Sequence, residues 1–252
     1  MPDRIRMFNI EIDRLTMGQA VEQLLLWVEK SEFSCRYVVT PNVDHVVKLQ
    51  KNDTFRAAYD AADMVVVDGK PVLLASRLLG KSLPETVPGS DLCPALFELA
   101  NQGTGLRVFL FGAADGVAER AAEAIQSRWP NIDVCGVYSP PMGFHADAPS
   151  NAVALEKINA AKPDVLLVGL GAPKQEIWTH AMRDRLQVKV ALCVGATIDF
   201  LAGEKARAPI WVRRIGMEWL HRALSEPRRL LGRYVYDAWV FPRLFIREWL
   251  GL

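Results

Sequence analysis

Three polar side chains directly follow two short apolar runs in the first third of the chain. Asp68 ends one run, and Thr40 and Asn42 end the other. Ligands of an open parallel sheet bind beyond the carboxyl ends of its strands, so a carboxylate, a hydroxyl and an amide are expected together in one site. Gly69 allows a sharp turn and leaves room for a ligand. Alternatively, Asp68 caps a helix that begins near Pro71.

A second polar cluster lies within residues 169–176 and includes Gly171. Pro173 suits the first turn of a helix, so Gln175 and Glu176 are expected in that turn, at the positive end of the helix dipole. Gln175 can both donate and accept hydrogen bonds, which suits recognition of a base or a sugar. Glu176 either contacts substrate or only compensates the dipole as a surface residue.

Glycines follow two further apolar runs. Gly112 could cradle a phosphate at a helix N-terminus, or it could simply fit a strand to a helix. The small residues of segment 195–203, which contains Gly195 and Asp199, suit close approach of the backbone to a ligand.

Several cofactor motifs are absent from the sequence. It contains no GxGxxG dinucleotide fingerprint, no P-loop, no GxSxG elbow and no C-x-x-C pair. Metal-dependent sugar transferases commonly hold an ion with two close aspartates, and no D-x-D occurs. We therefore expect neither a metal nor another cofactor, and we expect the four cysteines to be buried thiols in a reducing compartment.

Strand and helix signals alternate along the chain and predict a Rossmann-like parallel sheet flanked by helices. A strand is expected near the N-terminus, followed by a helix from Thr16 toward Lys30. Further strands are predicted at 36–40, 64–68, 107–112, 132–138, 164–169 and 189–195, and helices at 42–51, 54–61, 71–79, 91–101, 115–128, 151–161 and 174–185.

Charge divides the 252 residues into two parts. Residues 205–252 carry nine arginines, one lysine and four carboxylates, a net charge of +6, whereas residues 1–204 carry −5. Four of the seven tryptophans also lie after residue 204. We therefore expect an α/β catalytic domain at 1–204 and a basic helical appendage at 205–252. No signal peptide or apolar run of about 18 residues is visible, which predicts a soluble or peripheral protein.

Two helices are expected in the appendage, one beginning at Pro209 and one near Ser225 that Pro242 breaks. Leu231, Val235, Ala238 and Trp239 would share one side of the second helix. Tryptophan-rich helices lined by arginine lie readily at a membrane interface. The alternative is a docked helix pair that packs on the body or on a partner subunit.

Ordered motifs along nearly the whole chain resemble the WecB/TagA/CpsF family of bacterial glycosyltransferases. They are Thr40-Pro41-Asn42, residues 63–69, Pro88-Gly89-Ser90-Asp91-Leu92, residues 169–176 and 195–209, Met217-Glu218-Trp219-Leu220-His221-Arg222 and Glu226-Pro227-Arg228-Arg229.

The resemblance implies inverting, metal-independent transfer from a UDP-sugar to a polyprenyl-diphosphate-linked sugar on the cytoplasmic face of the membrane. Asp68 stands where the family has its proposed general base, and we group Thr40 and Asn42 with it as catalytic. Arginines of the appendage are expected to face the diphosphate. The expected substrate contacts are Gly69, Gly89, Asp91, Gly112, Gly171, Gln175, Glu176, Gly195, Asp199, Arg207, Arg214, Arg222 and Arg228.

One position departs from the family pattern. The family often carries an arginine just before the Gly-Ser-Asp motif, where this chain has Thr86. We therefore expect a glucosyl donor in exopolysaccharide assembly, with N-acetylmannosaminyl transfer as the alternative. A nucleotide-binding oxidoreductase and a membrane scaffold with a degenerate site are alternatives of other classes. Expected partners are the UDP-sugar, the lipid-linked acceptor, the inner membrane surface and a second copy of the chain, with no nucleic acid.

Overall fold

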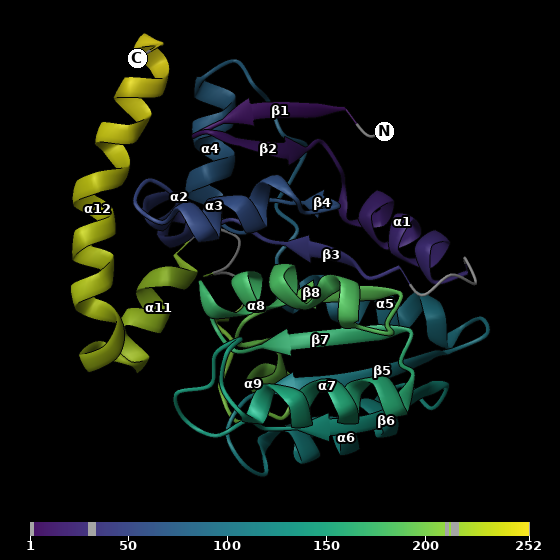
Figure 1. The fold of residues 1–252 in the computed structure, drawn as a ribbon. Helices are drawn as coiled ribbons and strands as arrows, with labels where there is room; N and C mark the ends of the chain where they lie inside the picture. The colour runs from purple at the N-terminus through teal and green to yellow at the C-terminus, as the bar shows by residue number, and fades with distance from the viewer. Residues whose placement is uncertain (1–2, 30–33, 210–211, 213–216, 252) are drawn as a thin grey trace.

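The computed structural model of the protein describes residues 3–29, 34–209, 212 and 217–251. Its centre is a six-stranded sheet with the order β4-β3-β8-β7-β5-β6 (Figure 1), and every pair of neighbouring strands is parallel. The α/β class expected from the sequence is confirmed. The strands are β3 (Arg36–Val39), β4 (Met64–Val65), β5 (Leu106–Gly112), β6 (Ile132–Tyr138), β7 (Val165–Gly169) and β8 (Val190–Cys193).

Helices cover both faces of the sheet and create two apolar cores. Successive residues of β5 show the arrangement, since Val108 and Leu110 face one core and Phe109 and Phe111 face the other. One core is closed by α1 (Met17–Glu29), α5 (Gly89–Asn101), α6 (Val117–Arg128) and α9 (Thr197–Leu201). The other is closed by α2 (Val43–Leu49), α3 (Asp53–Asp60), α4 (Lys70–Leu78), α7 (Ser150–Ala161) and α8 (Lys174–Met182), which a 3-10 turn (Arg183–Arg185) follows.

A small antiparallel hairpin of β1 (Arg4–Met7) and β2 (Ile10–Asp13) precedes the main sheet. The buried carboxylate of Asp13 accepts hydrogen bonds from Arg4 Nε at 2.7 Å and from the backbone N–H of Val65 at 2.7 Å. This side chain therefore fixes the hairpin to β4, at the edge of the sheet.

The strand expected at 64–68 is shorter in the structure, where regular strand pairing covers only Met64–Val65. The next residues nevertheless continue to bond to the segment of β3. The N–H of Val66 donates to Val39 O at 3.1 Å, and the N–H of Asp68 donates to Pro41 O at 2.8 Å. Residues 66–68 thus remain beside the end of β3. The segment 195–203, expected as a loop, instead contains the five-residue helix α9.

The appendage ends in α11 (Glu218–Ser225) and α12 (Pro227–Leu250), which stand along one side of the body (Figure 1). Part of the first expected tail helix, including Trp211 and Ile215, lies outside the described residues, and its later part is seen as α11. Among the described residues, no helix combines the length and the apolar character needed to cross a bilayer.

The expected break at Pro242 is wrong, because α12 continues through it to Leu250. Contacts with the body on the C-terminal side of the proline hold the last turns in place. Phe245 packs against an apolar core, and the carboxylate of Glu248 accepts from Lys81 Nζ at 2.7 Å and from the N–H of Phe8 at 3.1 Å. Tertiary contacts thus outweigh the hydrogen bond that the proline removes.

Candidate active site

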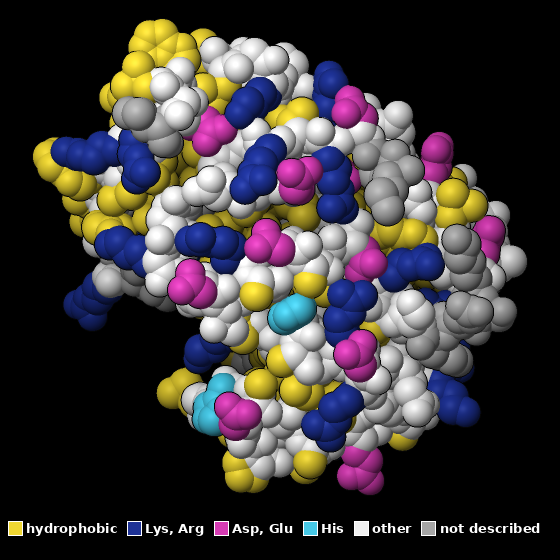
Figure 2. Space-filling model, turned by 45° about the horizontal axis from the view of Figure 1, so that its top comes forward, with side chains coloured by type: hydrophobic (Ala, Val, Ile, Leu, Met, Phe, Trp, Pro, Cys, Tyr) yellow, Lys and Arg dark blue, Asp and Glu magenta, His cyan; other side chains and the backbone are white. Residues whose placement is uncertain are grey.

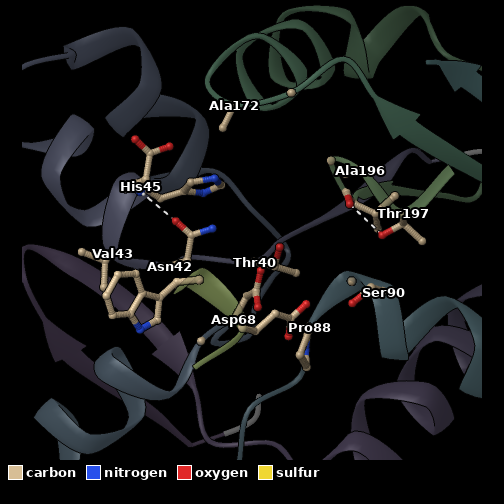
Figure 3. A pocket seen from close by; sticks show the side chains of 18 of the residues that line it. Thr40, Asn42, Val43, His45, Asp68, Pro88, Ser90, Ala172, Ala196 and Thr197 are labelled. Carbon is tan, nitrogen blue, oxygen red and sulfur yellow. Dashed lines mark hydrogen bonds between the residues drawn. The ribbon is translucent and has the colours of Figure 1, made fainter. Parts of the chain in front are cut away.

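A cavity of about 780 Å³ lies at the carboxyl edge of the sheet. Its walls come from the segments that follow β3, β4, β7 and β8, from the start of α5 and from one side of α12. Figure 3 shows this pocket from close by. The sequence-predicted residues that line it are Thr40, Asn42, Asp68, Gly69, Gly89, Asp91, Gly171, Gln175, Gly195 and Asp199.

Asp68 and Thr40 lie side by side in the cavity (Figure 3). The backbone hydrogen bond from Asp68 to Pro41 O explains the pairing, because it aligns the two strand ends. Helix α4 is capped by Gly69, whose φ is +107°, with no side-chain hydrogen bond. The capping role considered for Asp68 is therefore wrong, and its carboxylate belongs to the cavity wall.

Asn42 also lines the cavity, but its carboxamide oxygen has a structural task. It accepts a hydrogen bond from the N–H of His45 at 3.1 Å and so caps helix α2 (Figure 3). His45 lies deeper in the same wall, where burial lowers its pKa to about 4 and keeps the imidazole neutral near pH 7.

A third segment reaches the same place, because the N–H of Val87 donates to Val67 O at 2.7 Å. This bond brings Thr86 into the cavity wall close to Asp68. The position at which the sequence departs from the family pattern is therefore part of the site. Gly89, at the start of α5, packs so closely on the end of β8 that an added Cβ would lie 3.0 Å from Val194 Cβ.

Gln175 connects two of the glycine loops that line the cavity. Its Oε1 accepts from the N–H of Gly171 at 3.2 Å and from the N–H of Gly195 at 3.0 Å, while its Nε2 donates to Glu176 Oε1 at 2.8 Å. The side chain is almost wholly buried. Its polar atoms therefore bind protein groups, which the sequence did not indicate.

Several expected contacts, including Glu176, Gly112 and Arg228, are absent from the cavity lining. Glu176 is fully buried behind its lining, so both the surface role and direct substrate contact are wrong. Gly112 ends β5 beside β7, where an added Cβ would stand 2.6 Å from the carbonyl carbon of Gly169, and it is absent from the cavity lining. Arg228 is exposed on α12 and is absent from the cavity lining. Close packing accounts for Gly112 and burial for Glu176, whereas Arg228 faces solvent.

Arg207 lies next to the cavity and holds the segment that follows α9 onto α5. Its Nη1 contacts Asp91 Oδ1 at 2.7 Å, and its Nη2 donates to Ser90 Oγ at 3.0 Å. Arg214 lies outside the described residues, and the side chain of Arg222 is likewise not described.

Sequence reasoning missed the cavity face of α12. Two adjacent rows at a spacing of four line the cavity: Arg233, Asp237 and Phe241, and Tyr234, Ala238 and Pro242. The sequence signal for this face was the charged pair Arg233 and Asp237, which lies on the opposite side of the helix from the apolar stripe of Leu231, Val235 and Trp239. In the structure that apolar stripe is exposed. The reading of that stripe as packed on the body is therefore wrong.

Charges cluster where α12 meets α2. Arg233 Nη1 lies 3.6 Å from Asp44 Oδ2, which also accepts from Lys48 Nζ at 2.7 Å. Burial, with a contribution from Asp44, raises the pKa of Asp237 to about 6. Another cation of the lining, Lys205, has its Nζ 3.3 Å from the carboxylate of Asp199 and 3.6 Å from that of Glu226. Lys48 is outside the lining, whereas Arg233 and Lys205 add positive charge to it.

Comparisons with known proteins show the family of this chain. Over 227 residues, the chain is 30% identical to the N-acetylglucosaminyldiphosphoundecaprenol N-acetyl-beta-D-mannosaminyltransferases of Staphylococcus aureus strains MRSA252 and MW2. The match covers 90% of this chain and 87% of each relative. The sequence pattern of the "Glycosyl transferase WecG/TagA/CpsF family" matches residues 5–252. The chain therefore belongs to the WecG/TagA/CpsF family of glycosyltransferases.

Proposed function

We propose that the protein transfers N-acetylmannosamine from its UDP derivative to N-acetylglucosaminyl-diphosphoundecaprenol, with inversion at the sugar carbon. The carrying observation is that relatives with this activity align with nine tenths of the chain. The relatives do not support the glucosyl donor expected from Thr86, so the N-acetylmannosaminyl alternative is preferred. Membership in a glycosyltransferase family also removes the reason to consider an oxidoreductase.

Asp68 is the proposed general base. Its carboxylate takes the proton of an acceptor hydroxyl as that oxygen attacks C1 of the donor sugar, and the bond from C1 to the UDP oxygen breaks. Such assistance is worth about 10²–10⁴-fold in rate. Its place in the cavity, with Thr40 beside it, supports this role.

Two cations of the cavity wall are proposed to stabilise the departing UDP. Lys205 follows α9, and Arg233 projects from α12. Both are paired with carboxylates, Asp199 and Asp44 respectively, which hold them at the cavity. Fixed cations aimed at the diphosphate favour the transition state because they need no reorientation as charge develops.

A donor screen with the purified full chain tests the proposal. N-acetylglucosaminyl-diphosphoundecaprenol is offered with UDP-N-acetylmannosamine, UDP-N-acetylglucosamine or UDP-glucose, and the lipid product is analysed by mass spectrometry. We expect product from UDP-N-acetylmannosamine alone. Asp68→Asn should lower kcat by at least about 100-fold while UDP binding, measured by calorimetry, stays unchanged. Product from UDP-glucose would overturn the sugar assignment, and an active Asp68→Asn variant would overturn the base.

We also propose that the outer side of α12 lies on the cytoplasmic membrane surface, where a lipid-linked acceptor resides. Trp239 and Trp249 are 65% and 67% exposed there. Exposed Arg243 and Arg247 lie on the same helix. Figure 2 shows hydrophobic side chains gathered with Lys and Arg side chains at the left and upper left edge, where Figure 1 has α12. An amphipathic helix with aromatic and basic side chains suits an anionic leaflet.

Vesicle co-sedimentation tests the membrane contact. The double variant Trp239→Ser, Trp249→Ser should lose most of its binding to anionic vesicles, whereas Met142→Ser, which removes an exposed apolar side chain of the body, should bind as the wild type does. If the wild type fails to bind vesicles and instead forms a dimer that the double variant abolishes, a second copy covers this side of α12, and the membrane proposal fails.

A further inference from the structure

A buried carboxyl group lies immediately behind the cavity and has no role in the reaction described above. Glu176, in the first turn of α8, is fully buried, and its Oε2 has no hydrogen-bond partner. Burial raises its pKa to about 7. Burying such a group costs free energy that an apolar side chain would not cost, so packing alone does not explain a glutamate here.

Glu176 Oε1 accepts a hydrogen bond from the side chain of Gln175. Through its oxygen, Gln175 binds the N–H groups of Gly171 and Gly195 at once. A carboxamide can rotate so that its oxygen and nitrogen exchange places. The opposite orientation would set the NH₂ group against two N–H donors. An acceptor at Glu176 satisfies the NH₂ group only in the observed orientation.

The two loops joined in this way form one wall of the cavity. Gly171 and Ala172 follow β7, Gly195 and Ala196 follow β8, and all four residues line the cavity. Figure 3 labels the two alanines on their separate segments, across the pocket from Asp68. Both glycines have positive φ, +78° and +56°, one of several conformations open to glycine, so hydrogen bonds such as those to Gln175 are needed to select it.

Among the side chains that the structure describes, Gln175 is the one that links Glu176 to the cavity wall by a hydrogen bond. His45 Nδ1 lies 4.0 Å from Glu176 Oε1, beyond hydrogen-bond distance, and is instead 2.6 Å from the hydroxyl oxygen of Tyr59. Lys48, whose positive charge acts to lower the pKa of Glu176, is paired with Asp44.

We propose that Glu176 is a positioning residue for glycosyl transfer: it fixes the carboxamide of Gln175, which in turn sets the spacing of the loops after β7 and β8. The inference rests on the proposed transfer reaction for its kinetic consequence, but the loop geometry that it concerns exists in the free protein. Without an acceptor at 176, the buried NH₂ of Gln175 is unsatisfied and its carboxamide can turn, which releases both loop N–H groups.

Two substitutions of similar size separate this role from packing. Glu176→Gln keeps a carbonyl oxygen that can accept from Gln175, whereas Glu176→Met keeps the length and removes the acceptor. We expect Glu176→Met to lower kcat about 10–100-fold, as loss of geometric alignment does, with no loss of stability in urea unfolding. Glu176→Gln should restore kcat to within about threefold of wild type, since the hydrogen bond is restored.

A double-mutant cycle identifies Gln175 as the intermediary. In a Gln175→Met background, Glu176→Met should have no further effect on kcat, because the side chain through which it acts is gone. Additive losses would show that Glu176 acts by another route and would overturn the proposal. A loss of kcat that tracks a loss of stability in Glu176→Met would also overturn it, because that result is what a purely structural role predicts.

Amide hydrogen exchange, followed by NMR in the free protein, tests the same inference without a substrate. The N–H groups of Gly171 and Gly195 should exchange faster in Glu176→Met and at the wild-type rate in Glu176→Gln. Unchanged protection in Glu176→Met would overturn the positioning role. If the wild type proves inactive with UDP-N-acetylmannosamine, the proposed function fails, and the exchange rates still decide the role of Glu176.

Discussion

Replacing Gly112 with alanine tests whether this glycine serves packing or phosphate binding. Gly112 pairs with Gly169 across the junction of β5 and β7, with φ at +118°. A Cβ built on it would lie 2.6 Å from both the carbonyl carbon and the oxygen of Gly169, closer than real Cβ contacts. The obstacle is backbone, which cannot rotate away as a side chain can. The two strands must therefore separate locally.

The expected loss of unfolding free energy in Gly112→Ala has two contributions, and a second variant separates them. The strained φ costs about 1–2 kcal/mol, and forcing extra volume into a packed interior costs about 1–3 kcal/mol. Gly143, in the exposed loop after β6, also has a positive φ, +86°, but its added Cβ would meet nothing within 4 Å. Gly143→Ala should therefore lose only the unfolding free energy that the strained φ costs. Gly112→Ala should lose about 2–5 kcal/mol, the sum of the strained φ and the extra volume.

Urea unfolding of both variants measures the difference. At about 2–4 °C per kcal/mol for a chain of this size, Gly112→Ala should also lower Tm by roughly 5–15 °C. Equal unfolding free energies for the two variants would refute the steric reasoning. A Gly112→Ala protein with wild-type stability and weakened UDP binding would instead support the phosphate cradle that the sequence allowed.

Three further predictions concern residues at or beside the cavity. Asn42→Ala should cost about 1 kcal/mol of unfolding free energy through the lost cap of α2, whereas Asn42→Ser should keep most of it; equal losses in urea would contradict the capping role. Asp237 has its pKa raised from 3.8 to about 6 in the folded protein, so ionisation destabilises the fold as pH rises from about 4 to about 6. Asp237→Asn should therefore be more stable than wild type by about 1–3 kcal/mol at pH 7.5 and equal to it below about pH 4. Thermal unfolding at several pH values measures this difference, and a variant less stable than wild type at pH 7.5 would contradict the prediction. Arg207→Lys should increase protease cleavage near residues 203–209, since one ammonium cannot reproduce both the Asp91 and the Ser90 contacts, and unchanged digestion would refute that assignment.

Local patterns predicted the body of the fold well. Apolar runs with helix signals between them imply a parallel sheet covered on both faces, because connections between parallel strands must cross over it. That architecture places Thr40 and Asp68 at the same edge, and the structure brings both to one cavity. The length of α12 was not predictable in the same way, since contacts of Phe245 and Glu248 with distant parts of the chain carry the helix past Pro242.

By itself, the sequence determined the α/β class, the family and most of the segments that form the site, because strand ends and glycine turns are local features. Only the tertiary structure decided what individual polar residues contact. Asn42 caps α2, Gln175 joins two loops, Glu176 is buried behind the cavity, and Arg233 enters it from α12. The partner of a polar side chain depends on which distant segments pack around it, and that information is not present in the residue type or its neighbours along the chain.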